Sequence, residues 1–159
     1  DRQVYVGFMR RCFEESGRNV PDMVCGYVYD LFEGHTYYVH QTLHNVYAYN
    51  DPGVKITQEL INDTVGDIIQ DKEHSFLTQL SLLNYSQKET LIAIAKESEA
   101  SGVTSAAFVR KHSLQSPSAV QNAIRNLLNL QMITYRQDGR TKVYYVSDRF
   151  LQMWIVRKY

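Results

Sequence analysis

Residues 133–146 contain the feature that most limits how this chain can fold. Two short stretches of alternating apolar and polar residues, Ile133–Arg136 and Lys142–Val146, flank the sequence Gln-Asp-Gly-Arg-Thr at 137–141. Asp-Gly between such stretches is a strong signal of a β-hairpin, because glycine adopts a positive φ at little cost. The residues before this hairpin have the apolar period of helices. The sequence therefore predicts a hairpin attached to a helical unit.

Three predicted helices precede the hairpin and one follows it. Each begins at a residue whose side-chain oxygen can accept from the free amides of the first turn. These capping residues are Ser86, Thr104, Ser116 and Ser147. Ser86 forms a predicted capping box with Glu89, and Pro117 takes the first position of its helix. The predicted buried faces consist of Leu91, Ile92, Ile94 and Ala95; Phe108 and Val109; Val120, Ile124, Leu127 and Leu128; and Phe150, Leu151, Trp154 and Ile155.

Three helices followed by a hairpin is the order of a winged helix-turn-helix. Local signals at every boundary agree with this order, and such agreement is stronger than any single cap. A turn at Ser101-Gly102 separates the first two helices. The sequence predicts a winged helix-turn-helix domain with a small β-hairpin wing at residues 84–159.

The first half of the chain is predicted to be a helical bundle at residues 1–80, so the fold class is mainly α. Its second helix begins with Pro21 and ends at Gly34, and its third covers Thr36–Tyr49. Thr57 caps the fourth, with Ile56 and Ile61 as a hydrophobic staple. The predicted apolar positions of the first helix are Val4, Phe8, Cys12 and Phe13, and those of the second are Val24, Tyr27, Val28, Leu31 and Phe32.

The two halves of the chain carry opposite charge. Residues 1–103 contain 8 Lys and Arg against 15 Asp and Glu, whereas residues 104–159 contain 9 against 2. A basic unit of this kind suits a polyanion such as DNA. A basic unit can equally dock on an acidic neighbour, and the first half of the same chain is acidic.

The helix at 116–130 is the predicted recognition helix, since the second helix of a helix-turn-helix enters the major groove. Its polar face contains Ser118, Gln121, Asn122, Arg125 and Asn129, with no acidic residue among them. Asn and Gln can pair with an adenine edge and Arg with a guanine edge. Predicted phosphate contacts on either side are Arg110, Lys111, Arg136, Arg140 and Lys142. The alternative is an ordinary polar surface on a domain that contacts only proteins.

No residue pattern in the chain predicts catalysis or a metal site. His40 and His44 have the spacing of a zinc-protease motif, but Gln41 stands where that motif needs a glutamate base. The stripe at Asp63, Asp67 and Asp71 is typical of a solvated helix face. A phosphate-binding loop of the Gly-x-x-x-x-Gly-Lys-Ser/Thr type is absent. We therefore expect no catalytic residue, no metal and no cofactor in this chain.

The remaining composition predicts a cytoplasmic protein that does not enter the membrane. No apolar run approaches the roughly 20 residues that span a bilayer. Cys12 and Cys25 are expected to be buried, reduced thiols. Tyrosines crowd the first half at positions 27, 29, 37, 38, 47 and 49. Because tyrosine is favoured where one end of the ring is wet, part of this set is predicted to form a docking surface for another domain.

Several segments resemble the region after the nucleotide-binding core of bacterial and archaeal AAA+-type ATPases. These are Gly17–Pro21, Glu33–Gln41, Phe76–Leu80, Thr104–Ala106, Leu114–Gln121, Leu127–Leu128 and Tyr145–Trp154. The resemblance implies a helical lid followed by a winged helix, with an N-terminal P-loop ATPase core that binds ATP and magnesium outside this chain. It places Gly34, His35 and Thr36 near the nucleotide. Thr36 stands where proline is usual, so a helix-capping role is an alternative.

The resemblance makes a regulatory function the leading expectation. ATP binding in the core would move the lid, and the lid would reposition the winged helix on duplex DNA. The rival hypothesis is a signalling ATPase whose winged helix binds a protein partner or inhibits its own core. A stand-alone transcription regulator is a third possibility, which the lack of an initial methionine at Asp1 disfavours.

Overall fold

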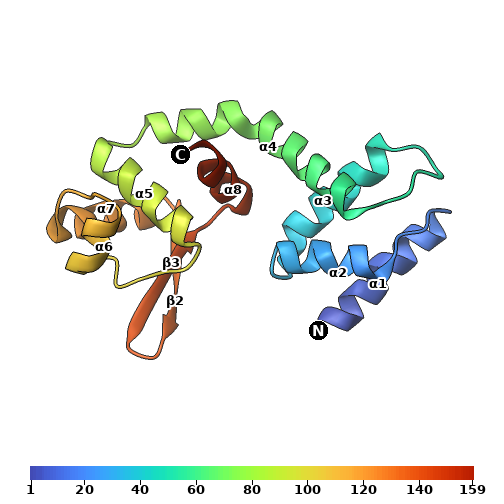
Figure 1. Ribbon diagram of the computed structural model, residues 1–159, viewed down its shortest axis with the longest axis horizontal. Coiled ribbons are helices and arrows are strands. Elements are labelled where there is room, and N and C mark those ends of the chain that lie inside the picture. The colour runs from blue at the N-terminus through green and yellow to red at the C-terminus, as the bar shows by residue number, and fades with distance from the viewer. The chain divides into compact units, whose positions relative to one another are not determined.

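A computed structural model describes all residues 1–159 and is mainly helical with one small antiparallel sheet, as predicted (Figure 1). The chain divides into two compact units, residues 1–70 and 71–159, and each is described by itself. Helix α4 (Gln58–Ser81) contributes residues to both. None of the helices combines the length and the apolar character needed to cross a membrane.

The first unit consists of α1 (Arg2–Glu15), α2 (Asp22–Leu31), α3 (Thr36–Tyr49) and the first part of α4. The predicted start of α4 is confirmed, because the Thr57 hydroxyl accepts from the Leu60 amide at 3.2 Å. Ile56 and Ile61 are both buried, as a hydrophobic staple requires. The core of this unit also contains Val20, Val24, Cys25, Val28, Phe32, Val39, Leu43 and Val46.

Of the predicted apolar positions of helix α1, only Phe13 belongs to the core. Val6, Met9 and Phe13 are buried, whereas Val4 is 69% exposed and Phe8 is 43% exposed. The prediction failed because α1 carries two apolar stripes, each at helical spacing. Periodicity identifies the helix but does not choose between two such stripes; packing against the other helices does.

The cysteine prediction is half wrong. Cys25 is fully buried in α2, and burial raises the pKa of its thiol to about 11. Cys12 is exposed on α1, on the stripe that the core does not use.

The elements of the second unit follow the predicted winged-helix order. This unit consists of the end of α4, α5 (Tyr85–Glu97), β1 (Ala100–Ser101), α6 (Ala106–Lys111), α7 (Pro117–Asn129), β2 (Ile133–Asp138), β3 (Thr141–Val146) and α8 (Arg149–Lys158). The hairpin β2–β3 extends away from the helices of this unit, and its connecting loop is only Gly139-Arg140 (Figure 1). The predicted buried faces of all four helices are confirmed, with Leu128 half-buried.

The sheet contains one strand more than predicted. Residues Ala100–Ser101 pair with β3 in the order β1-β3-β2. The sequence predicted a turn at Ser101-Gly102, and a two-residue strand is too short to show an alternating pattern. The turn itself follows at Gly102, which has a φ of +57°.

Helix α5 begins two residues earlier than predicted. The capping box joins Asn84 and Gln87, with both reciprocal bonds at 3.0 Å, so Ser86 and Glu89 are inside the helix. Two overlapping segments satisfy the capping-box spacing, namely Asn84–Gln87 and the predicted Ser86–Glu89. The earlier cap lengthens the helix by two residues, which is a little more than half a turn.

Two further caps lie one residue after their predicted positions. Ser105, instead of Thr104, accepts from the Phe108 amide at 3.1 Å at the start of α6. Asp148, instead of Ser147, accepts from the first amides of α8. In both cases two capping residues are adjacent, and the sequence cannot separate them. The Ser116 cap of α7 is confirmed.

The turn between α2 and α3 also differs from the predictions. His35 occupies the N-cap position of α3 without a side-chain bond, and Thr36 is the first helical residue, so Thr36 does not cap the helix. Pro21 likewise precedes α2 instead of beginning it.

Candidate nucleic-acid interface

The outward face of α7 is the centre of the candidate site. The Ser116 hydroxyl accepts from the Ala119 amide at 3.2 Å, and Pro117 follows at the first helical position. Val120, Ile124 and Leu127 fix the inner face by burial. The residues predicted to meet DNA, Ser118, Gln121, Asn122, Arg125 and Asn129, are all exposed. The helix therefore presents a polar face with one cation and no carboxylate.

Asn122 differs from its neighbours on this face. It lines a small hollow of about 140 Å³ between α7 and the start of α5, together with Asn84 and Gln87. Both of those side chains are committed to the α5 capping box. Asn122 is thus at the edge of the face, whereas Arg125 is exposed and makes no ion pair.

The predicted cations of the wing lie on opposite faces of the hairpin. Gln137 pairs with Lys142 and Arg136 pairs with Val143. Successive residues of a strand alternate between faces, so Arg136 and Lys142 cannot both face the same phosphate row. The Lys142 ammonium is 4.2 Å from the Tyr135 ring centroid, a cation–π contact. Arg140 is exposed in the loop and makes no ion pair.

Two of the predicted phosphate contacts are already ion-paired within this unit. The Lys111 ammonium is 2.6 Å from Oε1 of Glu97. The Arg136 guanidinium donates to both carboxylate oxygens of Glu99, at 2.5 and 2.9 Å. Sequence reasoning missed both glutamates, because the partners are 14 and 37 residues apart and no spacing rule joins them. Arg110 is exposed on α6 without an ion pair.

Comparison with known protein families decides what this unit is. Residues 74–157 match the family described as a probable winged helix domain. The chain belongs to this family. Neither the curated proteins nor the solved structures contain a significant match to the sequence. The winged helix domain therefore includes the last turns of α4.

Glu97 connects α5 to α6 within the winged helix domain. Its Oε1 atom lies 2.6 Å from the Lys111 ammonium and 2.7 Å from Nε2 of His112. Hydrogen bonds from Lys111 and then His112 hold the pKa of the Glu97 carboxyl below its ordinary value. A carboxyl whose pKa is depressed by folding stabilises the folded state above its unfolded pKa, and this contribution is lost as the pH falls through the folded pKa.

We therefore expect Glu97→Gln to reduce the stability of the winged helix domain in a pH-dependent way. At pH 6 the free energy of unfolding should fall by about 1 kcal/mol, because a charged hydrogen-bond acceptor is lost. The difference from the unmodified protein should narrow as the pH is lowered from 5 to 3. This difference is measured by urea unfolding at each pH, with the fluorescence of Trp154 as the signal. An equal difference at pH 6 and pH 3 would contradict this role.

The residues that the AAA+ resemblance places near a nucleotide lie outside the winged helix domain. Gly34 and His35 lie between α2 and α3, and Thr36 begins α3; His35 and Thr36 are exposed. Gly34 has a φ of +74°, and its amide donates to the Tyr29 carbonyl at 2.9 Å. A nucleotide contact here stays a prediction, while helix termination and packing already explain the glycine.

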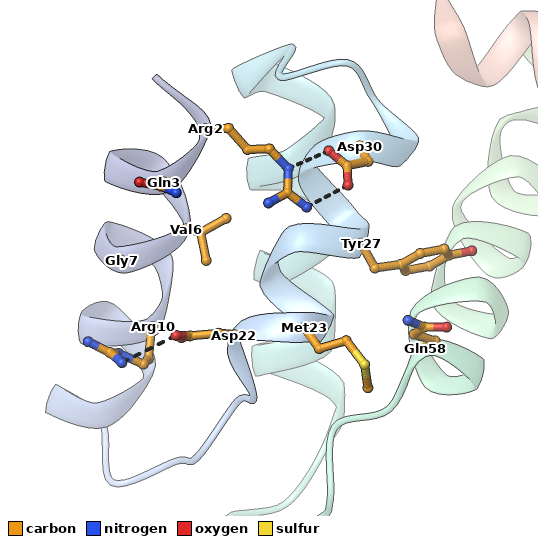
Figure 2. A pocket seen from close by; sticks show the side chains of 10 residues that line it. All are labelled: Arg2, Gln3, Val6, Gly7, Arg10, Asp22, Met23, Tyr27, Asp30 and Gln58. Carbon is orange, nitrogen blue, oxygen red and sulfur yellow. Dashed lines mark hydrogen bonds and ion pairs between the residues drawn. The ribbon is translucent and has the colours of Figure 1, made fainter.

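The first unit contains an open hollow of about 710 Å³ lined by α1, α2 and the start of α4 (Figure 2). Arg2 donates to both oxygens of Asp30, at 2.7 and 2.6 Å, and Arg10 is 3.4 Å from Asp22. The Arg2 guanidinium holds the pKa of the Asp30 carboxyl below its ordinary value. Each arginine has an aspartate partner on α2, so the hollow offers no net charge to a ligand.

The candidate metal positions do not converge in the structure. His40, His44 and Cys12 line one apolar hollow of about 250 Å³ between α1 and α3. No group of three His, Cys, Asp or Glu residues has an arrangement that could hold a metal ion. Asp63, Asp67 and Asp71 are exposed along α4.

The tyrosines of the first unit are partly exposed. Tyr37, Tyr47 and Tyr49 are 62%, 46% and 81% exposed. The Tyr27 hydroxyl donates to the Asn62 side chain at 2.6 Å. Since several rings remain at the surface, a docking surface for another domain stays a prediction.

Proposed function

We propose that the winged helix domain binds duplex DNA through the outward face of α7 and the wing. The observation that carries this proposal is the exposed face around Arg125, which has no carboxylate and no ion pair. A helix with such a face can enter the major groove, where Gln121 can bond an adenine edge and Arg125 a guanine edge.

The charge of the second unit supports the proposal. Residues 71–159 contain 12 Lys and Arg against 7 Asp and Glu. Arg110, Arg125 and Arg140 are exposed without ion pairs and are available for phosphate or base contacts. With so few free cations, binding should be weak at physiological salt and should strengthen only moderately as salt is removed, because the salt dependence scales with the number of phosphates neutralised.

We further propose that this chain is the regulatory region of a P-loop ATPase. Its support is the resemblance of the first unit to the AAA+ lid. The nucleotide-binding core, with ATP and magnesium, would belong to the parent protein outside these residues. Nucleotide binding there would change DNA affinity only if it favours one of two lid states. DNA binding by the parent protein with and without ATP tests this part.

A protein partner is the competing function, and the ion pairs favour it. Lys111 and Arg136 are neutralised by Glu97 and Glu99, which removes two cations from the DNA-facing set. A domain that recognises a protein needs no such cations.

Charge reversal separates the two functions. We expect Arg125→Glu and Arg140→Glu each to weaken binding to a random duplex about fivefold to tenfold at low salt. Arg157→Glu on α8 is the matched control, since Arg157 is also exposed without an ion pair. Electrophoretic shift at two salt concentrations measures these affinities. No shift by the unmodified chain, even at low salt, would refute the DNA proposal.

A further inference from the structure

The connection between α5 and β1 is a tight, strained turn that carries two glutamates. Ser98 has φ +59° and ψ −48°, and the Glu99 amide donates to the Glu97 carbonyl at 2.6 Å. This is the rarer form of the three-residue γ-turn, in which the central residue has a positive φ. A non-glycine residue is strained in such a conformation. The turn places the Glu97 and Glu99 side chains where α6 and the wing can reach them.

The two glutamates hold their cations with different strength. The Glu97 carboxylate binds Lys111 and also His112, whose side chain is only 10% exposed and packs 4.6 Å from the Phe108 ring. In the Glu99–Arg136 pair, each of the two side chains is 51% exposed. Exposed pairs contribute little to stability and are weakened by salt. The Glu97 side chain is 25% exposed and also contacts His112, whereas the Glu99 side chain is 51% exposed, so a competing anion reaches the Glu99–Arg136 pair more easily.

The Arg136 pair has the geometry of phosphate recognition. Two guanidinium nitrogens donate in parallel to the two oxygens of Glu99. Arginine binds phosphate with the same two-pronged fork. The carboxylate thus occupies the donors that a DNA phosphate would use.

We infer that Glu99 is a built-in competitor for DNA, holding Arg136 until a backbone phosphate displaces it. Arg136 becomes a DNA contact only by exchanging partners, whereas Lys111 stays bound to Glu97 and is not a contact. The turn therefore lowers the affinity of the domain for DNA and makes this affinity depend on whether the Glu99–Arg136 ion pair is exchanged for a phosphate contact. This inference rests on the proposed DNA binding.

Removing the competing charge tests the inference. Glu99→Gln should bind a random duplex about threefold to fivefold more tightly at low salt, on the scale of one exposed ion pair. The plot of log affinity against log salt should become steeper by about one, since one more phosphate is neutralised. Glu89→Gln is the control, because it removes the same charge from α5 at a residue without an ion pair.

A double variant identifies the cation involved. The gain from Glu99→Gln should disappear when Arg136→Gln is present, because the two residues act as one pair. Urea unfolding followed by Trp154 fluorescence verifies that each variant is folded.

The outcomes distinguish this inference from the proposed function. If the unmodified chain binds DNA through Arg125 but Glu99→Gln binds no better than Glu89→Gln, the inference is overturned and the proposed function stands. If neither the unmodified chain nor Glu99→Gln binds at low salt, both are overturned. Binding by Glu99→Gln alone supports the competitor role of Glu99 and refutes DNA binding by the unmodified chain.

Discussion

Replacing Phe76 with alanine is expected to destabilise the winged helix domain by about 3–5 kcal/mol, the cost of deleting a fully buried aromatic ring. Phe76 is in α4 and only 2% exposed, and its ring centroid is 5.6 Å from that of Trp154. The preceding turn of α4 adds Glu73, which accepts from Nε1 of Trp154 at 3.2 Å and from Lys158 at 2.7 Å. The end of α4 is thus part of this domain's core.

The neighbouring residue provides a matched control for this prediction. Leu77 is 42% exposed, and Leu77→Ala should cost less than about 1 kcal/mol. Urea unfolding with fluorescence detection is specific to this domain, because Trp154 is the only tryptophan in the chain. Equal losses for both variants would show that the end of α4 is not packed as described.

The winged-helix order could be predicted because each of its elements has a local signal. The hairpin is specified by Asp138-Gly139, and α7 by Ser116 and Pro117, all of which act within a few residues. The errors arose where two local signals compete, as at Asn84 and Ser86. A choice between adjacent caps depends on the packing of the whole helix, which no short window contains.

The candidate interface was predictable only in part. The outward face of α7 follows from helical period once its buried side is known. The pairing of Arg136 with Glu99 does not follow from any pattern, because β1 was not recognised and the sheet register brings these residues together. The sequence therefore identified the cations but overestimated how many of them are free.

Gly34→Ala is expected to destabilise the first unit by about 2–3 kcal/mol. Gly34 has a φ of +74°, which an alanine adopts only with a penalty of about 1–2 kcal/mol. An added Cβ would also lie 2.7 Å from both Cζ and the hydroxyl oxygen of Tyr29. The tyrosine ring would have to move, and it would lose its contact with Tyr5, whose centroid is 5.7 Å away.

A second glycine separates the backbone penalty from the steric one. Gly17 has a φ of +75°, and a Cβ there would meet nothing within 4 Å. Gly17→Ala should therefore cost only the backbone penalty, about 1–2 kcal/mol. Urea unfolding followed by far-ultraviolet circular dichroism compares the two variants. In a Tyr29→Ala background, the additional cost of Gly34→Ala should fall to that of Gly17→Ala, since the side chain in conflict is gone.

This comparison also bears on the resemblance to AAA+ lids. Because the chain is measured without nucleotide, a larger loss at Gly34 than at Gly17 would assign the glycine to packing against Tyr29. Equal losses would leave its particular position in the α2–α3 turn without a packing explanation. The positive φ would then account for both glycines, and a nucleotide contact at Gly34 would stay a prediction.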